Sequence, residues 1–445
     1  MTFTPIWGLP FAGLLLSIAL WPLAAPRFWH RHSGKIAALW ALAFLLPCAA
    51  AAGAGAAWHT LLEVLLTQYA PFILLLTALY TAAGGIHLRG NLHGSPALNC
   101  GLLLAGGLLA SVMGTTGASM LLIRPLIRAN DNRKRAAHVV VFFIFIAGNI
   151  GGALTPLGDP PLFLGFLQGV AFFWTFHHLL AQTALLMAAL LVIFYFLDRH
   201  YFRKDGIFEP DPTPSTHSLR VEGAVNFALI AAVVALVLIR GMWPSGITLH
   251  VAGVALGLPD IVCDAGLLAV TLISLVITPR AARQNNRFNW TPMREVAQLF
   301  AGIFLTIVPA IAMLQAGQAG PFGAVLRAIT GANGAPVPAL YFWAVGALSS
   351  FLDNAPTYLV FFNAAGGNAS HLMTALPATL AAISAGAVFM GANTYIGNAP
   401  NLMVKAIANH QGIAMPGFLG YMAWSGAILL PLFAVVTALM LAGCY

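Results

Sequence analysis

The sequence predicts an all-α polytopic membrane protein made of two inverted-topology repeats, each with a re-entrant hairpin and a broken transmembrane helix. The prediction rests on composition, on the placement of apolar runs and basic residues, and on an internal repeat. Of the 445 residues, 60% are hydrophobic and only 7% are charged, and the mean hydropathy is +0.87. Soluble domains carry about 25% charged residues, so we expect a lipid bilayer to surround this chain.

Ten apolar runs are long enough to cross a bilayer. They lie at 6–26, 35–54, 61–83, 136–166, 176–197, 222–242, 260–278, 296–316, 374–410 and 417–442. With the N-terminus outside, all 20 basic residues except Arg240, Arg327 and Lys405 fall on the cytoplasmic side, as the positive-inside rule requires. We therefore expect both termini outside, and a first run that is a retained span because no basic segment precedes it.

Two further apolar pieces, 98–128 and 337–365, are interrupted at their middles by "MGTTGAS" and "FLDNAPT". Irregular backbone at membrane depth is tolerated only where protein or a cavity surrounds it. We therefore predict that each piece is a re-entrant hairpin, which enters and leaves the membrane on one side. The runs 136–166 and 374–410 contain glycine, proline and polar residues, which predict broken helices.

An internal repeat links these irregular segments. The stretch "GALTPLGDPPLFL" begins at Gly152, and "GANTYIGNAPNLM" begins 239 residues later at Gly391, with five identities in 13 positions. The same offset carries Ser111 in the first hairpin onto Ser350 in the second. The chain then divides into N-terminal spans (1–60), a first repeat (61–200), a cytoplasmic connector with intervening spans (201–295), and a second repeat (296–445).

The predicted topology starts the two repeats on opposite sides of the membrane, so the repeats are inverted. Inverted repeats with broken helices at corresponding places are typical of secondary transporters, whose substrate site lies near the bilayer midplane. Broken ends supply carbonyl oxygens and partial positive charge at such a site. The sequence contains no nucleotide-binding Gly-Lys loop, which argues against ATP-driven pumping.

The segments "GNIGGALTPLGDPPLFL", "SSFLDNAPTYLVFF" and "GANTYIGNAPNLMVKAIA" resemble the paired signature segments of the ion transporter superfamily. This superfamily includes citrate and dicarboxylate carriers, arsenite permeases and NhaD-type sodium/proton antiporters. Its dicarboxylate members typically carry Ser-Asn-Thr motifs at the hairpin tips, and this chain does not. The resemblance to the antiporter-like members lies in aspartates at a hairpin and at a broken helix, and it implies cation/proton exchange and a homodimer.

Four acidic residues lie within or beside the apolar zone, where a charge costs at least about 2.5 to 3.5 kcal/mol. Asp159 and Asp353 are the candidate ion-binding carboxylates, although each precedes a Pro-containing helix start or turn and can serve as a cap instead. Asp260 and Asp264 are expected to lie at the outer interface. Lys405 is expected to reach the cytoplasmic surface, with a countercharge to an aspartate as the alternative.

Neutral polar residues gather at the same four breaks. Each can simply bond to its own helix backbone, but together they predict a shell of ligands around an ion or substrate. The candidates are Thr115, Thr116, Thr155, Asn354, Thr357, Asn393, Thr394, Asn398 and Asn401.

These features predict a non-enzymatic secondary transporter that exchanges sodium or lithium for protons by alternating access. Both cations compete for the carboxylates, because a desolvated aspartate favours a proton and a bound hard cation excludes it. The alternative is a sodium- or proton-coupled carrier of citrate or another carboxylate. We expect a bacterial inner-membrane location, no cofactor beyond the coupling ions, and no nucleic-acid partner. The four scattered cysteines indicate neither disulfides nor a metal cluster.

Overall fold

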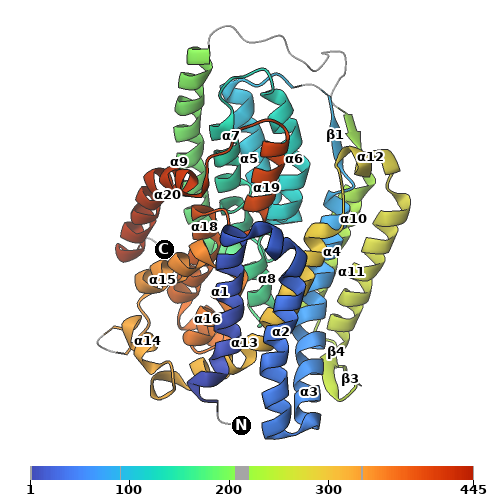
Figure 1. The fold of residues 1–445 in the computed structure, drawn as a ribbon, viewed down its shortest axis with the longest axis vertical. Coiled ribbons are helices and arrows are strands. Elements are labelled where there is room, and N and C mark those ends of the chain that lie inside the picture. The colour runs from blue at the N-terminus through green and yellow to red at the C-terminus, as the bar shows by residue number, and fades with distance from the viewer. Residues whose placement is uncertain (1–2, 91, 206–219, 332–333, 444–445) are drawn as a thin grey trace.

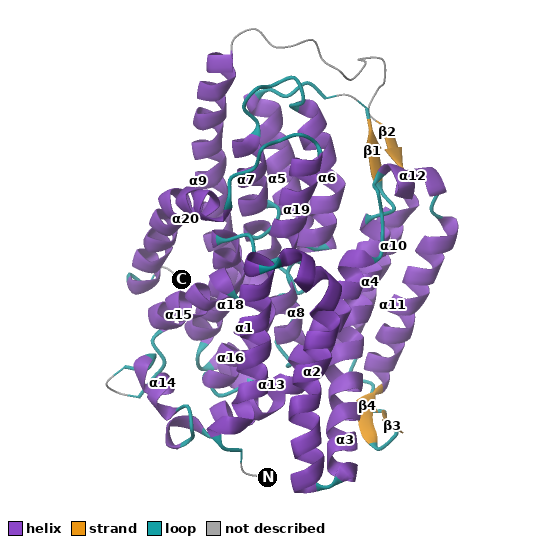
Figure 2. Cartoon of the chain, in the orientation of Figure 1, coloured by secondary structure: helices purple, strands orange, loops and turns teal. Residues whose placement is uncertain are grey.

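The computed structural model describes residues 3–90, 92–205, 220–331 and 334–443, and these residues are mostly helical (Figure 2). Two short antiparallel strand pairs accompany the helices: β1 (His87–Arg89) with β2 (Arg220–Glu222), and β3 (Thr248–Val251) with β4 (Val254–Gly257). The predicted all-α polytopic class is confirmed.

Nine helices in the described ranges are long and apolar enough to cross a membrane. They are Pro5–Ala24, Pro26–Ala52, Ala54–Gly84, Pro96–Met113, Trp174–Asp205, Val225–Met242, Leu258–Ile277, Thr291–Gln315 and Phe418–Leu441. Eight of them correspond to predicted spans, and Pro96–Met113 is the first arm of the first predicted hairpin. The runs 136–166 and 374–410 are divided into shorter helices by irregular backbone, as the glycines and prolines there predicted.

The N-terminal spans differ from the prediction in where they begin. The second helix starts at Pro26 and not at residue 35, because its basic first turns are helical, and the third starts at Ala54 and not at residue 61. Gly53, with φ of +90°, separates them, so the alanine-rich stretch is helical on both sides of one glycine break. The elements are η1 (Pro5–Gly8), α1 (Leu9–Ala24), α2 (Pro26–Ala52), α3 (Ala54–Val64), the π-helical η2 (Leu65–Tyr69) and α4 (Ala70–Ala83).

The first irregular unit consists of a helix pair and a broken helix. α5 (Pro96–Met113) and α6 (Thr115–Ala129) join at Gly114, whose φ of +80° produces the sharp turn. The chain then forms α7 (Ala137–Ile146), η3 (Ile150–Ala153), α8 (Pro160–Leu167) and the long α9 (Trp174–Asp205).

Residues 206–219 of the predicted connector lie outside the described residues. The intervening elements are α10 (Val225–Met242), α11 (Leu258–Ile277) and α12 (Arg280–Asn285).

The second unit repeats the pattern of a helix pair followed by a broken helix. Its pair is α15 (Pro338–Phe351) and α16 (Asn354–Ala364), and its broken helix comprises α18 (Pro377–Met390), η5 (Gly391–Asn393) and α19 (Ala399–His410). The neighbouring elements are α13 (Thr291–Gln315), η4 (Gly317–Ala319), α14 (Gly323–Ala328), α17 (Ala369–Thr374) and α20 (Phe418–Leu441).

The broken helices form the centre of the protein. α7 from His138 to Ile146 and α18 from Thr379 to Met390 are buried on all sides, whereas outer helices such as α2 bury one face only. Along the long axis of the molecule, Figure 1 shows α5, α6, α7 and α19 in one half of the protein and α8, α15 and α16 in the other half. The two breaks therefore lie where the halves meet.

Candidate functional site

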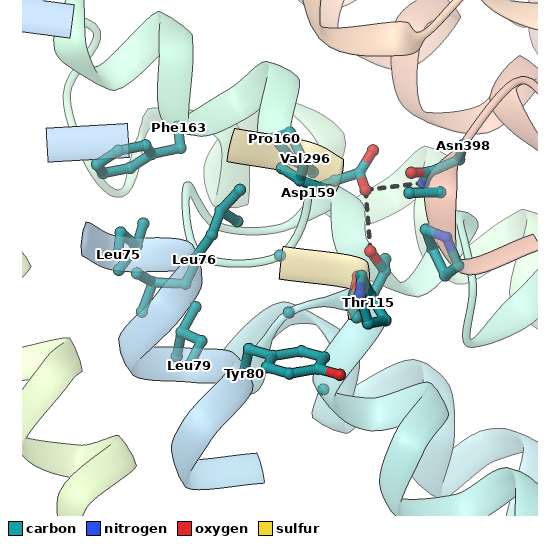
Figure 3. A pocket seen from close by; sticks show the side chains of 18 of the residues that line it. Leu75, Leu76, Leu79, Tyr80, Thr115, Asp159, Pro160, Phe163, Val296 and Asn398 are labelled. Carbon is teal, nitrogen blue, oxygen red and sulfur yellow. Dashed lines mark hydrogen bonds between the residues drawn. The ribbon is translucent and has the colours of Figure 1, made fainter. Parts of the chain in front are cut away.

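The carboxylate of Asp159 lies at the centre of the buried polar site. Asp159 precedes α8 in an extended conformation, and its side chain does not cap that helix. It accepts instead from Thr115 Oγ1 at 3.0 Å, Asn398 Nδ2 at 2.9 Å and Asn354 Nδ2 at 2.5 Å. Figure 3 shows the first two of these bonds. The capping alternative therefore does not describe the Asp159 side chain, which is only 2% exposed.

The three donors come from the other three irregular segments. Thr115 begins α6, Asn354 begins α16 and Asn398 immediately precedes α19. Four helix N-termini therefore meet at one carboxylate, where their partial positive charges stabilise a negative group. The structure brings together four of the predicted site residues in this way, while ion binding by them stays a prediction.

The second candidate carboxylate is held differently. Asp353 precedes α16, and its Oδ1 accepts from the backbone N–H of Ala355 at 3.0 Å. This is a regular N-cap, so the capping alternative does describe Asp353. Its half-buried side chain also lines the cavity beside Asp159, and an ion-binding role for it stays a prediction.

The cavity at these tips has a volume of about 110 Å³ and two kinds of wall. The polar wall is built from the ends of α6, α8, α16 and α19, whereas α4 and α13 supply an apolar wall that the sequence analysis did not anticipate (Figure 3). The polar lining residues are Thr115, Thr116, Asp159, Asp353, Asn354 and Asn398, and the apolar wall includes Leu75, Leu76 and Leu79 of α4 and Val296 and Phe300 of α13, with Phe163 of α8 as a further apolar lining residue.

The other five candidate residues lie outside this lining, and four of them donate to backbone carbonyls. Thr155 and Thr394 donate to Ser111 O and Ser350 O, each on the hairpin of its own repeat. The remaining three form backbone or hairpin contacts as well: Thr357 donates to Asp353 O, Asn393 to Ser350 Oγ, and Asn401 to Gly391 O and Thr394 O. Their hydrogen bonds hold the breaks in shape.

Two serines complete the same arrangement in both units, although the sequence analysis used them only as markers of the repeat. Ser111 Oγ donates to Gly151 O at 2.5 Å, and Ser350 Oγ donates to Met390 O at 3.1 Å. In the second unit, the donor and the acceptor each lie 239 residues further along the chain than in the first. Their identity across the repeat was the signal that pointed to a shared structural role.

Asn149 connects the two broken helices directly. Its Nδ2 donates to Asn401 Oδ1 at 2.8 Å, and Asn398 Nδ2 donates to Gly148 O at 3.1 Å. Asn354 Oδ1, in contrast, is buried without a hydrogen-bond partner next to Asp159. A buried acceptor of this kind fits a cation or a proton donor.

Arg240, Asp260 and Asp264 form one ionic cluster far from Asp159 in the sequence. Arg240 Nε lies 2.9 Å from Asp260 Oδ1, and its Nη1 lies 3.0 Å from Asp264 Oδ1. This pairing explains why an arginine that breaks the positive-inside pattern is present.

Lys405 contacts an aromatic ring and not one of the two aspartates. Its Nζ lies 4.0 Å from the ring centroid of Tyr395, a cation–π contact. Within the described residues it forms no ion pair with Asp159 or Asp353, so the countercharge alternative is wrong for this structure.

The nine apolar helices of the described residues and a buried polar site between broken helices define a multi-pass membrane protein of the transporter class. The chain belongs to the family described as "Putative citrate transport", whose model matches residues 1–441. This family agrees with the resemblance to citrate-type carriers of the ion transporter superfamily. No curated protein matches the chain significantly.

Proposed function

We propose that this protein is an ion-coupled secondary transporter that carries citrate or a related carboxylate anion across the membrane by alternating access. The observation that carries the proposal is the convergence of four helix N-termini on one buried cavity. Such N-termini present N–H groups and partial positive charge, which favour anions. The description of the family supports a citrate-type substrate over the cation exchange that the aspartates alone favoured.

Asp159 and Asp353 supply the coupling step in this proposal. A carboxylate substrate enters a cavity that already holds two acidic side chains, so a sodium ion or a proton must neutralise part of that charge. The unpartnered Asn354 Oδ1 lies beside Asp159 and adds a neutral oxygen ligand, a donor set that suits a hard cation.

Alternating access follows from the proposed inverted repeats. The serine and threonine hydrogen bonds recur at the 239-residue offset, which supports two related units. Rocking of one unit against the other would open the cavity to either side in turn. A superposition of 61–200 on 296–445 by a rotation of about 180° around an axis in the membrane plane stays a prediction.

Exchange of sodium or lithium for protons is the second candidate. It is favoured by the lining of the cavity, in which the described residues include two aspartates but no lysine, arginine or histidine. In this case the cations themselves are the cargo, and no anion enters.

Transport in proteoliposomes separates the two functions. We expect uptake of labelled citrate driven by an inward sodium or proton gradient, with Asp264→Asn as a control that alters a carboxylate outside the cavity. Proton movement on addition of sodium or lithium, without citrate uptake, would overturn the carboxylate proposal in favour of exchange.

A further inference from the structure

A second cavity lies far from the proposed transport site, and its lining shares no residue with it. Its volume is about 580 Å³, and it is bounded by the segment before α7, the end of α9, the connection from α19 to α20, and α20 itself. Figure 1 shows α9 and α20 along one edge of the molecule. Binding in this second cavity does not depend on which substrate the protein transports.

One wall of this cavity is strongly basic. Arg133, Lys134 and Arg135 precede α7 and Lys204 lies on α9, and all four line the cavity, whereas its described lining contains no aspartate or glutamate. Asp198 and Asp205 lie behind the wall and pair with the two arginines, so two positive charges remain uncompensated by these carboxylates.

Arg133 is fixed in this wall before any ligand arrives. Its side chain is fully buried, with Nη2 2.7 Å from Asp198 Oδ1 and Nη1 donating to Asn130 Oδ1 at 3.0 Å. Its Nε lies 4.0 Å from Asp205 Oδ2. Asp198 is held in turn by His138 and Asn99, so Arg133 belongs to a rigid network.

The N-terminus of α7 opens at the same place. The helix has ten residues, and its N-cap residue, Ala136, provides no side-chain acceptor. Its partial positive charge therefore adds to that of the basic residues. Together with the exposed Lys134 and Lys204 side chains, this arrangement suits a phosphate group.

The rest of the lining includes apolar and aromatic side chains. Among them are Ile413, which follows α19, and Trp424 of α20. A free phosphate would use the basic wall alone, whereas an amphiphile would also use these apolar side chains. Tryptophan is enriched where membrane proteins contact lipid headgroups.

We propose that this cavity binds the phosphate headgroup of an acidic phospholipid, with Lys134, Arg135 and Lys204 around the phosphate and Trp424 against the glycerol and upper acyl region. Basic pockets between transmembrane helices are suited to such headgroups. A bound lipid would join α7, which leads into the first broken helix, to α9 and α20.

The test compares the full-length protein in detergent with phosphatidylglycerol, phosphatidylcholine or inorganic phosphate, by native mass spectrometry and by thermal unfolding. The variant Lys134→Ala/Lys204→Ala removes two exposed cations without touching the Arg133 network. Lys35→Ala/Arg294→Ala removes two exposed cations elsewhere and serves as the matched control.

We expect phosphatidylglycerol to bind and to raise the Tm of the wild-type protein and of the control, and we expect the Lys134/Lys204 variant to bind it at least about tenfold more weakly. Equal binding of phosphatidylcholine, or an unchanged response in the Lys134/Lys204 variant, would overturn the proposal. An equal Tm shift with inorganic phosphate would also overturn it, because the site would then take a free anion.

Discussion

The two irregular units share a backbone conformation just before the second half-helix but differ in their polar side chains there. Asp159 and Asn398 both precede a half-helix, with φ and ψ of −140° and 143° against −150° and 140°. Thr155 and Thr394 make the same bond to the hairpin of their own repeat. Yet one position carries a charge and the other an amide, and these two side chains touch across the junction at 2.9 Å.

The hairpin tips differ as well. Gly114 turns the first tip with a positive φ, whereas its counterpart, Asp353, has a negative φ of −58° and caps α16. Gly114 therefore shows that the first tip forms without a carboxylate. It does not show that the second tip would form without one, because there the carboxylate of Asp353 caps α16. The comparison separates residues that shape the breaks, which are the same in both units, from residues that face the cavity, which are not.

The largest effect is expected for Asp159→Asn. This change removes the charge and converts one of the two acceptor oxygens into an NH₂ group, which then faces the donors that this oxygen accepted from, at a cost of about 1–3 kcal/mol for the unmet hydrogen bonds. We expect gradient-driven citrate uptake in proteoliposomes to fall at least about 100-fold. The folded fraction after size-exclusion chromatography controls for misfolding. Uptake close to wild type would show that the buried carboxylate is structural.

Asp353→Asn should have the next largest effect on transport but little effect on stability. Asparagine caps a helix about as well as aspartate, so we expect the thermal midpoint to stay near that of the wild type. Uptake should fall about tenfold because the second negative charge at the cavity is lost. Asp353→Ala, which removes the cap, should in addition cost about 1 kcal/mol of stability. If Asp353→Asn transports normally, Asp353 is a cap only.

Thr155→Val and Thr394→Val test the common part of the comparison. Each removes a hydroxyl donor from a hairpin carbonyl, and we expect each to destabilise the protein by about 1–3 kcal/mol, to a similar extent in both units. Thermal unfolding measures the effect. Thr306→Val is the control, because Thr306 bonds only within its own helix and its loss should cost less. A large loss of stability for only one of the two variants would contradict equivalent roles of Thr155 and Thr394.

Asp264→Asn should have the smallest effect. Arg240 keeps Asp260 as a partner at 2.9 Å, and partly exposed ion pairs contribute about 0–1 kcal/mol. Uptake should therefore stay within about twofold of wild type. A loss comparable to that of Asp159→Asn would move the functional carboxylate to the Arg240 cluster.

Much of this organisation could be predicted from the sequence. Composition and apolar runs predicted the polytopic class, and the recurrence of Thr155 as Thr394 predicted related breaks. The sequence could not tell that these threonines bond to backbone while Asn398 turns towards Asp159, because a side-chain direction depends on packing between segments far apart in the chain. The apolar wall from α4 and α13 was missed for the same reason. A leucine in a transmembrane helix does not reveal from the sequence whether it faces lipid, the protein core or a cavity.

The central claim is that transport requires one carboxylate at the contact between the two broken helices. This carboxylate faces the cavity that both units form. Exchanging the two residues tests this most directly, through citrate uptake by Asp159→Asn, Asn398→Asp and the double variant. Because the two side chains lie 2.9 Å apart on equivalent backbones, we predict that the double variant recovers uptake at least about tenfold above Asp159→Asn. A folded double variant that transports no better than Asp159→Asn would contradict the claim.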